Sequence, residues 1–251
     1  MTLSPWPYPR WFAHRGAGKL APENTLAAFR VGAAHGYRAF ECDVKLSADG
    51  LPFLLHDATL QRTTSGRGPA AALPWRDLAR LDAGGWHSRA FAGEPPPSLD
   101  GIARFCLRNG FALNIEIKPT PGTEHETGGS VAECASALWR QAGTPPLLSS
   151  FQPTALEGAR AAAPHLPRAL LLDVLRDGWL DEALALGCAA VVTAYSLIDA
   201  AVLTRIRGAG LNALVYTVND PAEAHRLVGL GIGGIITDAV DRFSPGDGVD
   251  C

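Results

Sequence analysis

Short apolar runs alternate along the chain with longer stretches in which apolar residues recur at helical spacing. We predict strands at Trp11–His14, Arg38–Asp43, Ala112–Ile117, Pro146–Ser150, Arg168–Leu172, Ala190–Thr193, Asn212–Thr217 and Gly233–Thr237. Segments of helical length separate most of these runs. Asn24–His35 is one of them, with Thr25 as its candidate N-cap. Repeated strand–helix units of this kind predict a parallel sheet.

The number of strand–helix units bears on how the sheet is arranged. Eight units in a chain of 251 residues favour a closed (β/α)8 barrel, the TIM barrel, and an α/β chain of this length commonly forms one domain. An open, doubly wound sheet is the competing architecture.

One stretch interrupts the alternation directly after the second predicted strand. Two extended runs flank Asp49-Gly50, a dipeptide typical of hairpin turns. The residues that follow, 58–97, are rich in Gly, Pro and Arg, and a helical pattern is present only near Trp75–Leu81. We therefore predict a single barrel domain over residues 1–251, with a small insertion at about 58–97 that folds over one mouth of the barrel.

Composition and charge narrow the classes of partner. Hydrophobic residues make up 47% of the chain and charged residues 19%, as in a globular protein, and the net charge is −3. The chain has no cluster of Lys and Arg, which argues against a nucleic-acid partner. The five cysteines are widely spaced and form no CxxC pair, so we expect reduced thiols. Met1–Arg10 has no apolar core and no apolar run reaches 18 residues, so we predict neither a signal peptide nor a membrane span.

The polar residues best suited to chemistry lie where predicted strands end. They form four short groups, which are His14-Arg15-Gly16, Glu41-Cys42-Asp43, His56-Asp57 after the hairpin, and Glu116-Ile117-Lys118. In a barrel the C-terminal ends of the strands form the face that carries the active site. We therefore expect the four groups to meet at one mouth of the barrel.

The alternation of side chains along a strand places three carboxylates on a common face. Glu41 and Asp43 point the same way with Cys42 opposite, and Glu116 does so on the neighbouring strand. Converging carboxylates need a compensating charge, and oxygen ligands suit one Mg²⁺, Ca²⁺ or Mn²⁺.

Ion pairing is the alternative use for these carboxylates. Arg15, Arg38 and Lys118 are the cations within reach in the sequence pattern. An ExD pair alone favours that interpretation. An ExD pair beside the ExK of the next strand favours the metal site.

Two histidines stand apart from the others because each follows a strand and precedes a charged residue. His14 precedes Arg15 and His56 precedes Asp57. A lone histidine is more often structural, but a pair suits general acid–base catalysis near neutral pH. We assign no role to His35, His87, His125, His165 and His225.

The motifs together resemble a known family. In order and spacing, the set HRG, APENT (Ala21–Thr25), ExD, HD, EIKP (Glu116–Pro119) and YTVN (Tyr216–Asn219) resembles the glycerophosphodiester phosphodiesterase family, from about Trp6 to Asp241. The stretches GKLAPENTLAAF, NIEIKPT and PPLLSSF further resemble its cytosolic bacterial branch, which is associated with glycerol-3-phosphate uptake. The resemblance implies a cytoplasmic enzyme that hydrolyses small glycerophosphodiesters to glycerol 3-phosphate and an alcohol.

The resemblance also implies a role for each group of residues. It implies His14 and His56 as the acid–base pair. The implied ligands of the divalent cation are Glu41, Asp43 and Glu116. Arg15 and Lys118 would contact the phosphate. Glu23 and Asn24 match a motif that supports the catalytic histidine and arginine, and helix capping is the alternative for Asn24.

The walls of the predicted pocket are less well marked by the motifs. Phe151 and Tyr216 end strands and are candidates to line the alcohol side, with core packing as the alternative. Tyr216 stands where the family often has Trp, and Ala239-Val240 where it often has Pro. Val191–Ser196 lacks the polar pattern expected at the sixth strand, so the pocket wall on that side is not predicted.

Two other functions are compatible with the same barrel. A lysophospholipase D or phospholipase acting on lipid would need an apolar rim. The insertion offers Trp75, Trp86 and Phe91, but five arginines lie among them and no apolar run joins them. A ligand-binding barrel without activity would have lost a histidine or a carboxylate, and every expected position is filled.

Two routes for the reaction are also compatible with these residues. A neighbouring glycerol hydroxyl can attack the phosphate to give a cyclic phosphate that water then opens, or water can attack directly. Either histidine can be the acid. The motifs favour no particular head group, and they carry no sign of the oligomeric state.

Overall fold

The computed structural model describes residues 6–243 and 245. Residues 1–5, the start of the segment considered for a signal peptide, and Cys251 lie outside the described residues. The other four cysteines, Cys42, Cys106, Cys134 and Cys188, are free thiols. In the described part of the chain, no helix is long and apolar enough to cross a membrane.

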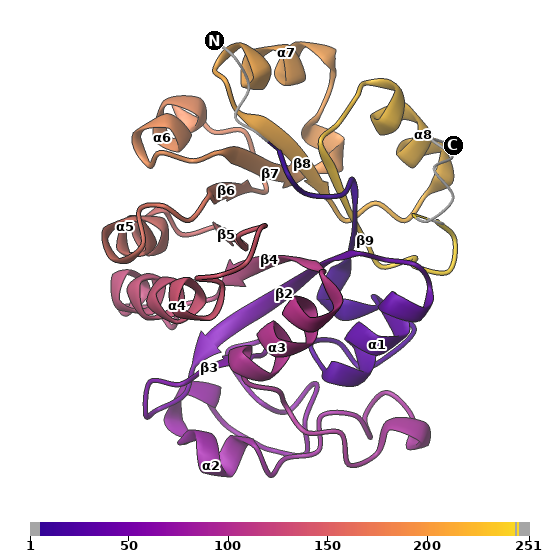
Figure 1. The fold of residues 1–251 in the computed structure, drawn as a ribbon, viewed down its shortest axis with the longest axis vertical. Coiled ribbons are helices and arrows are strands. Elements are labelled where there is room, and N and C mark those ends of the chain that lie inside the picture. The colour runs from indigo at the N-terminus through magenta and orange to yellow at the C-terminus, as the bar shows by residue number, and fades with distance from the viewer. Residues whose placement is uncertain (1–5, 244, 246–251) are drawn as a thin grey trace.

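Eight parallel strands close into a barrel (Figure 1). They are β1 (Trp11–Ala13), β2 (Ala39–Leu46), β4 (Ala112–Ile117), β5 (Leu147–Ser150), β6 (Arg168–Leu172), β7 (Ala190–Ala194), β8 (Asn212–Tyr216) and β9 (Gly234–Thr237). β1 pairs with β9 on one side and with β2 on the other, where Ala13 lies opposite Phe40. This pairing closes the sheet, so the predicted TIM barrel is confirmed and the open sheet is excluded.

Helices surround the barrel in the order that the strand–helix pattern predicts (Figure 1). They are α1 (Leu26–Ala34), α3 (Leu99–Asn109), α4 (Glu124–Leu138), α5 (Pro153–Ala162), α6 (Trp179–Ala185), α7 (Ala200–Gly208) and α8 (Pro221–Gly229). A short 3₁₀ turn, η4 (Tyr195–Leu197), precedes α7. The apolar core therefore has two layers, one inside the barrel and one between strands and helices.

Alternating residues of each strand divide between these two layers. Phe12, Leu171 and Leu214 belong to the buried cluster inside the barrel. Cys42 and Ile115 belong to the cluster that includes residues of the surrounding helices. Cys42 thus faces the helix layer, as the alternation around Glu41-Cys42-Asp43 predicts, and its two neighbours face the interior.

The predicted strand bounds differ from the observed ones mainly at the ends. β2 continues past its predicted end at Asp43 to Leu46, because Val44, Lys45 and Leu46 pair with the antiparallel strand β3 (Pro52–Leu54). β1 ends at Ala13, and His14 begins a 3₁₀ turn, η1 (His14–Gly16).

The first helix begins directly after its predicted cap. Thr25 is its N-cap, with Oγ1 accepting a hydrogen bond from the Ala28 amide at 3.2 Å. Asn24 lies outside the helix in the left-handed region, with φ of 58°. The prediction that Thr25 caps this helix is therefore confirmed, whereas the Asn24 side chain binds Asp43 of β2.

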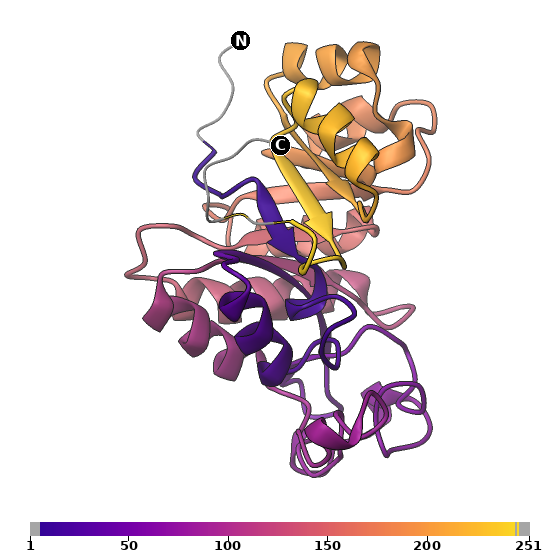
Figure 2. The ribbon, with the colours of Figure 1, turned by 90° about the vertical axis from the view of Figure 1, so that its right-hand side faces the viewer.

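Residues 58–97, called the insertion segment below, lie at one end of the molecule (Figures 1 and 2). They contain η2 (Ala70–Ala72), α2 (Trp75–Leu78) and η3 (Arg89–Phe91), so the helical pattern predicted to Leu81 ends earlier. A separate apolar cluster consists of Phe53, Leu55, Leu60, Ala70 and Leu78. The segment also reaches the barrel helices, since Glu94 Oε1 accepts from the Ala27 amide of α1 at 2.9 Å.

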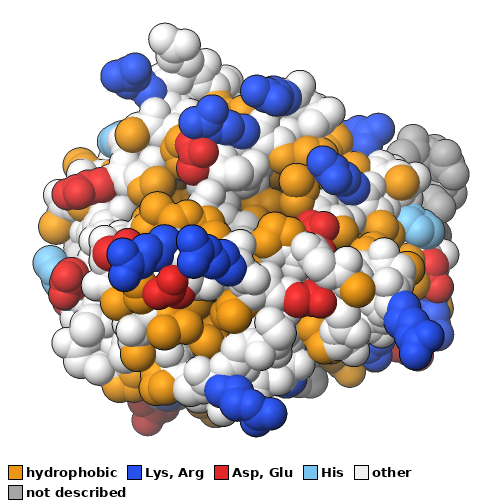
Figure 3. All heavy atoms as spheres, turned by 90° about the horizontal axis from the view of Figure 1, so that it is seen from below, with side chains coloured by type: hydrophobic (Ala, Val, Ile, Leu, Met, Phe, Trp, Pro, Cys, Tyr) orange, Lys and Arg blue, Asp and Glu red, His pale blue; other side chains and the backbone are white. Residues whose placement is uncertain are grey.

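Figure 3 views the molecule from the end that carries the insertion segment. Lys, Arg, Asp and Glu side chains lie among the hydrophobic ones on this face (Figure 3). Of the three aromatic residues considered for a lipid-binding rim, Trp86 is 42% exposed, whereas Trp75 packs against the insertion's apolar cluster. Among the described residues, charged and hydrophobic side chains therefore alternate on this face, which does not form the apolar rim that a lipid substrate would need (Figure 3).

Candidate active site

A cavity of about 220 Å³ lies at the C-terminal ends of the barrel strands. Most residues singled out in the sequence line it. The lining residues are His14, Arg15, Glu41, His56, Asn114, Glu116, Lys118, Phe151, Leu171, Tyr216, Thr217 and Ile236. Asp43 is fully buried beside them. Glu23 and Asn24 do not line the cavity but contact Arg15 and Asp43 from behind.

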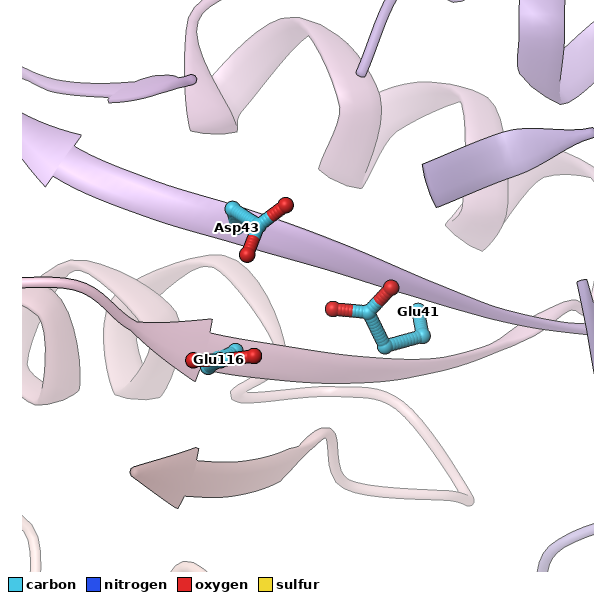
Figure 4. Close-up of side chains that lie close together, drawn as sticks. All are labelled: Glu41, Asp43 and Glu116. Atoms are coloured by element: carbon cyan, nitrogen blue, oxygen red, sulfur yellow. The ribbon is translucent and has the colours of Figure 1, made fainter. Parts of the chain in front are cut away.

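Three carboxylates converge in this cavity (Figure 4). Glu41 and Asp43 project from β2 and Glu116 from β4, where it lies opposite Asp43 in the strand register. One oxygen of each lies within 4.8 Å of the others. The alternation of side chains and the pairing of β2 with β4 are thus enough to bring the three carboxylates together.

Burial and mutual repulsion make these carboxylates costly in their charged forms. Burial, followed by the charge of Asp43, raises the pKa of Glu41 to about 8 and that of Glu116 to about 7. Burial acts on Asp43 in the same direction, but nearby cations, led by Arg15, outweigh it and lower its pKa. Asp43 therefore carries a charge at neutral pH more readily than its two neighbours.

The carboxylates fit a hard divalent cation. Glu41 Oε1 and Asp43 Oδ1 are buried and have no hydrogen-bond partner among the described residues. Buried polar atoms are seldom left without a partner, so an ion at this place would satisfy both. The all-oxygen set suits Mg²⁺, Ca²⁺ or Mn²⁺.

A tight turn after β1 places His14 and Arg15 beside this set. Arg15 has φ of 50°, and its amide donates to Glu41 Oε2 at 3.0 Å. Gly18 allows the turn to pass close to the end of β9, since a Cβ there would lie 2.1 Å from the Asp238 carbonyl oxygen. The two glycines of HRGAG therefore have different structural reasons, since Gly18 lies against the end of β9 and Gly16 against α1, where a Cβ would lie 2.8 Å from Ala28 Cβ.

His14 is held by a carboxylate that the sequence analysis did not single out. Its Nδ1 lies 2.6 Å from Asp238 Oδ1, and its Nε2 lies 3.7 Å from Glu41 Oε2. Asn219 fixes Asp238 in turn, accepting from its amide at 2.8 Å and donating to Oδ2 at 3.2 Å. Because the Asp238 carboxylate only accepts hydrogen bonds, the proton of the neutral ring lies on Nδ1. Nε2 then faces Glu41 and is free to exchange a proton.

His56 has the same kind of support from its neighbour. Its Nδ1 lies 2.7 Å from Asp57 Oδ1, which directs the proton to Nδ1. The surroundings move the two histidines in opposite directions. For His14, burial lowers the pKa, but Asp238 and Glu41 outweigh it and the pKa is raised. For His56, burial dominates and the pKa is lowered, although Asp43 and Asp57 oppose it.

The two supporting residues from the APENT motif bind different partners. Glu23 Oε1 accepts from Arg15 Nη1 at 2.8 Å. Asn24 Nδ2 donates to Asp43 Oδ2 at 2.8 Å, and Asn24 Oδ1 accepts from the Asp43 amide at 3.1 Å. Arg62 of the insertion segment, missed in the sequence, also binds Glu23.

The cationic and aromatic side of the cavity is formed by Lys118, Phe151 and Tyr216, which lie at the ends of β4, β5 and β8. Lys118 Nζ donates to Glu116 Oε1 at 2.9 Å and lies 5.7 Å from the centre of the Phe151 ring. Phe151 meets Tyr216 edge to face, with ring centres 5.8 Å apart. Lys45, which continues the Glu41 and Asp43 face, donates to the Lys118 carbonyl at 3.1 Å and was also missed, because β2 is longer than predicted.

The segment Val191–Ser196, which lacks the expected polar pattern, contributes nothing to the cavity lining among the described residues. Val192 of β7 packs in the barrel interior below the mouth. Asp238 and Arg62 had weaker signals in the sequence. The first follows the last strand in a Thr-Asp pair, and the second lies five residues after Asp57.

Comparison with known proteins gives a consistent set of similarities. A model of the glycerophosphoryl diester phosphodiesterase family matches residues 14–242. A glycerophosphodiester phosphodiesterase of Caldanaerobacter subterraneus subsp. tengcongensis is 32% identical over 90% of this chain and 92% of its own length. One from Bacillus subtilis is 27% identical over 92% of this chain and 84% of its own.

Solved structures are similar over the same extent. A phosphodiesterase of Oleispira antarctica, in complex with the product sn-glycerol-3-phosphate, has a TM-score of 0.87 and 33% identity over 94% of this chain and 95% of that one. A glycerophosphodiester phosphodiesterase of Agrobacterium tumefaciens has a TM-score of 0.80 and 29% identity over 94% and 99%.

Proposed function

The chain belongs to the glycerophosphoryl diester phosphodiesterase family and is an enzyme of that activity, and we propose that it uses a divalent cation and two histidines to hydrolyse small glycerophosphodiesters to glycerol 3-phosphate and an alcohol. One observation carries the proposal. Glu41 and Glu116 line a cavity of about 220 Å³ together with two histidines, each held through Nδ1 by its own carboxylate, and Asp43 converges on the two glutamates from directly beside the cavity. The solved relative that contains sn-glycerol-3-phosphate supports the same substrate class.

The residues divide into those that hold the substrate and those that move protons. Glu41, Asp43 and Glu116 would hold the cation, which when bound supplies Lewis-acid polarisation of a phosphate oxygen. Arg15 and Lys118 are the cations of the cavity wall, and we assign them to the phosphoryl oxygens. In the structure Arg15 pairs with Asp43 and Lys118 with Glu116. With a cation bound, these two carboxylates would hold the cation, and the two basic side chains would be available to the phosphate.

The histidines are assigned to general acid–base catalysis. One accepts a proton at Nε2 from the attacking hydroxyl, and the other donates a proton from Nε2 to the leaving alcohol. The pKa is raised for His14 and lowered for His56, which fits two histidines in different roles. The attacking hydroxyl belongs to the glycerol or to water, and either histidine can serve as the acid.

The remaining assignments concern support and surroundings. Glu23 positions Arg15, Asn24 positions Asp43, and Phe151 with Tyr216 forms the wall on the alcohol side. We propose that residues 1–251 act as one barrel domain with the insertion at about 58–97. The motifs shared with the cytosolic branch of the family support a cytoplasmic location for the enzyme.

An assay on two substrates tests the proposal against action on lipid. We expect release of glycerol 3-phosphate from glycerophosphocholine, loss of this activity in EDTA, and its return with Mg²⁺, Ca²⁺ or Mn²⁺. Lysophosphatidylcholine should be a poor substrate. Faster turnover of lysophosphatidylcholine would favour a lysophospholipase D or phospholipase, and full turnover in chelator would remove the metal assignment.

Metal binding should stabilise the protein more at high pH than at low pH. The pKa of Glu41 is raised to about 8 and that of Glu116 to about 7, from 4.5. The uncharged forms therefore stabilise the metal-free fold fully below about pH 4.5, and this stabilisation is lost progressively as the pH rises to between 7 and 8. A cation requires the charged forms. Thermal unfolding should show a larger increase in Tm with Mg²⁺ or Mn²⁺ at about pH 8.5 than at about pH 6.

The control for the thermal shift is Glu41→Gln, which removes one of the two titrating groups. In this variant the pH dependence of the metal effect should shrink. Equal increases in Tm at both pH values in the unmodified protein would contradict a cation at these carboxylates.

A further inference from the structure

Arg62 lies in the insertion segment and joins two carboxylates that support different parts of the site. Its Nε donates to Asp57 Oδ2 at 2.6 Å and its Nη2 to Asp57 Oδ1 at 2.9 Å. On the other side, Nη1 donates to Glu23 Oε2 at 2.7 Å and Nη2 to Glu23 Oε1 at 2.8 Å. Both contacts are bidentate, a geometry that a guanidinium group offers and an ammonium group does not.

Each carboxylate continues to a residue of the cavity. Asp57 holds Nδ1 of His56 at 2.7 Å, and Glu23 holds Nη1 of Arg15 at 2.8 Å. The guanidinium group therefore lies at the centre of a chain that runs from His56 through Asp57 and Glu23 to Arg15. One end of the chain is assigned to proton transfer and the other to the phosphate.

His14, by contrast, is supported within the barrel itself. Its carboxylate, Asp238, is fixed by Asn219 of the loop after β8, which donates to Asp238 Oδ2 and accepts from the Asp238 amide. The support of His56 comes instead from a side chain on the insertion segment. The two histidines thus differ in what holds them, although the first contact is alike.

An isolated surface ion pair would contribute little, and Arg62 is 45% exposed. Two features set this contact apart from such a pair. Its partners are less exposed, with Glu23 at 12% and Asp57 at 26%, and the four hydrogen bonds fix the planes of both carboxylates. The orientation of each carboxylate in turn fixes the side chain that lies in the cavity.

We propose that Arg62 is a positioning residue that aligns His56 and Arg15 with each other, so that the insertion segment completes the active site. The inference rests on the proposed function, because it assigns a shared geometry to the acid–base and phosphate-binding groups. It makes the insertion segment part of the catalytic apparatus.

Replacement of Arg62 should change both kcat and KM, and the two effects should be separable by mutating its two partners. Arg62→Ala should lower kcat for glycerophosphocholine roughly 10–100-fold, as expected for a loss of alignment, and should raise KM as well. Asp57→Asn should reproduce mainly the kcat effect and Glu23→Gln the KM effect. Adding either to Arg62→Ala should cost less than the product of the single effects, because all three act through one chain.

Arg62→Lys separates alignment from charge. A lysine keeps the charge but cannot bind both carboxylates bidentately, so its kcat should lie closer to that of Arg62→Ala than to that of the unmodified enzyme. The matched control is Arg76→Ala in the same segment, whose side chain is 81% exposed. That variant should stay within about twofold of the unmodified enzyme.

Chemical rescue distinguishes positioning from a general effect on folding. Because the site of the Arg62 side chain is open to solvent, guanidinium or methylguanidinium at millimolar concentration should restore part of the kcat of Arg62→Ala. Ammonium chloride at the same ionic strength should not. Rescue of the rate with an unchanged Tm is the expected result, because a folding defect would change Tm as well.

Several results would overturn the inference. They are kcat and KM of Arg62→Ala within threefold of the unmodified enzyme, full activity in Arg62→Lys, fully multiplicative effects in the double variants, or a loss that guanidinium does not reverse. The unmodified enzyme is assayed in parallel. If it fails to hydrolyse glycerophosphocholine, the proposed function fails and the inference with it, whereas an active enzyme that is insensitive to Arg62 contradicts only the inference.

Discussion

Replacing His14 or His56 with alanine should lower kcat by about 10²–10⁴-fold and leave KM nearly unchanged. This is the range that a general acid or base typically contributes, and neither histidine is assigned to ground-state binding of the phosphate. Steady-state kinetics on glycerophosphocholine at saturating metal measures both constants. The two effects should be non-additive, since both residues act in one proton-transfer sequence.

The pH dependence provides a second readout for the same variants. The unmodified enzyme should give a bell-shaped profile of kcat against pH, and each alanine variant should lose one limb. His125→Ala, an exposed histidine of α4, is the matched control and should keep both limbs. A change in kcat of less than threefold for His14 or His56 would make that residue structural.

Glu41→Gln should abolish most of the activity while leaving the metal-free protein at least as stable. The loss should be on the order of 10²–10³-fold, because Glu41 would hold an ion that contributes several kcal/mol to transition-state stabilisation. Stability is retained because burial already raises the pKa of Glu41 to about 8, so the neutral amide resembles the form that the metal-free fold favours.

Two measurements check this prediction together. Titration with Mn²⁺ or Mg²⁺ gives the concentration needed for half-maximal activity, which should rise strongly in Glu41→Gln. Thermal unfolding in chelator gives the Tm, which should not fall. Cys42→Ala is the neighbouring control, since Cys42 faces the helix layer and its loss should cost packing without changing the metal requirement. Unchanged activity in Glu41→Gln would show that the cation, if used, lies elsewhere.

The barrel and the convergent carboxylates could be predicted because both follow from local periodicity. The alternation through Glu41-Cys42-Asp43 fixes which side chains face inward, and parallel pairing with the next strand brings Glu116 to the same level. Lys45 follows the same alternation but was missed, because the predicted strand ended at Asp43, whereas the end of β2 depends on pairing with β3.

Contacts between distant segments could not be predicted in this way. Asp238 meets His14 across 224 residues of sequence, and Arg62 meets Glu23 across 39. No spacing rule connects such positions, and only closure of the barrel and folding of the insertion bring them together. The contact of Asn24 with Asp43 is of the same kind, because it joins the loop after β1 to β2 across 19 residues of sequence.

The position of Arg62 has a consequence for how such a barrel can be altered. A loop that only covers a site can be shortened or exchanged between proteins while the rest of each protein keeps its structure. Here a transplanted segment would need to deliver a guanidinium to one point, between the carboxylates of Asp57 and Glu23. The insertion and the barrel therefore cannot be exchanged independently of each other. A replacement of the insertion segment must keep the contact of Arg62 with both carboxylates or supply another support for His56.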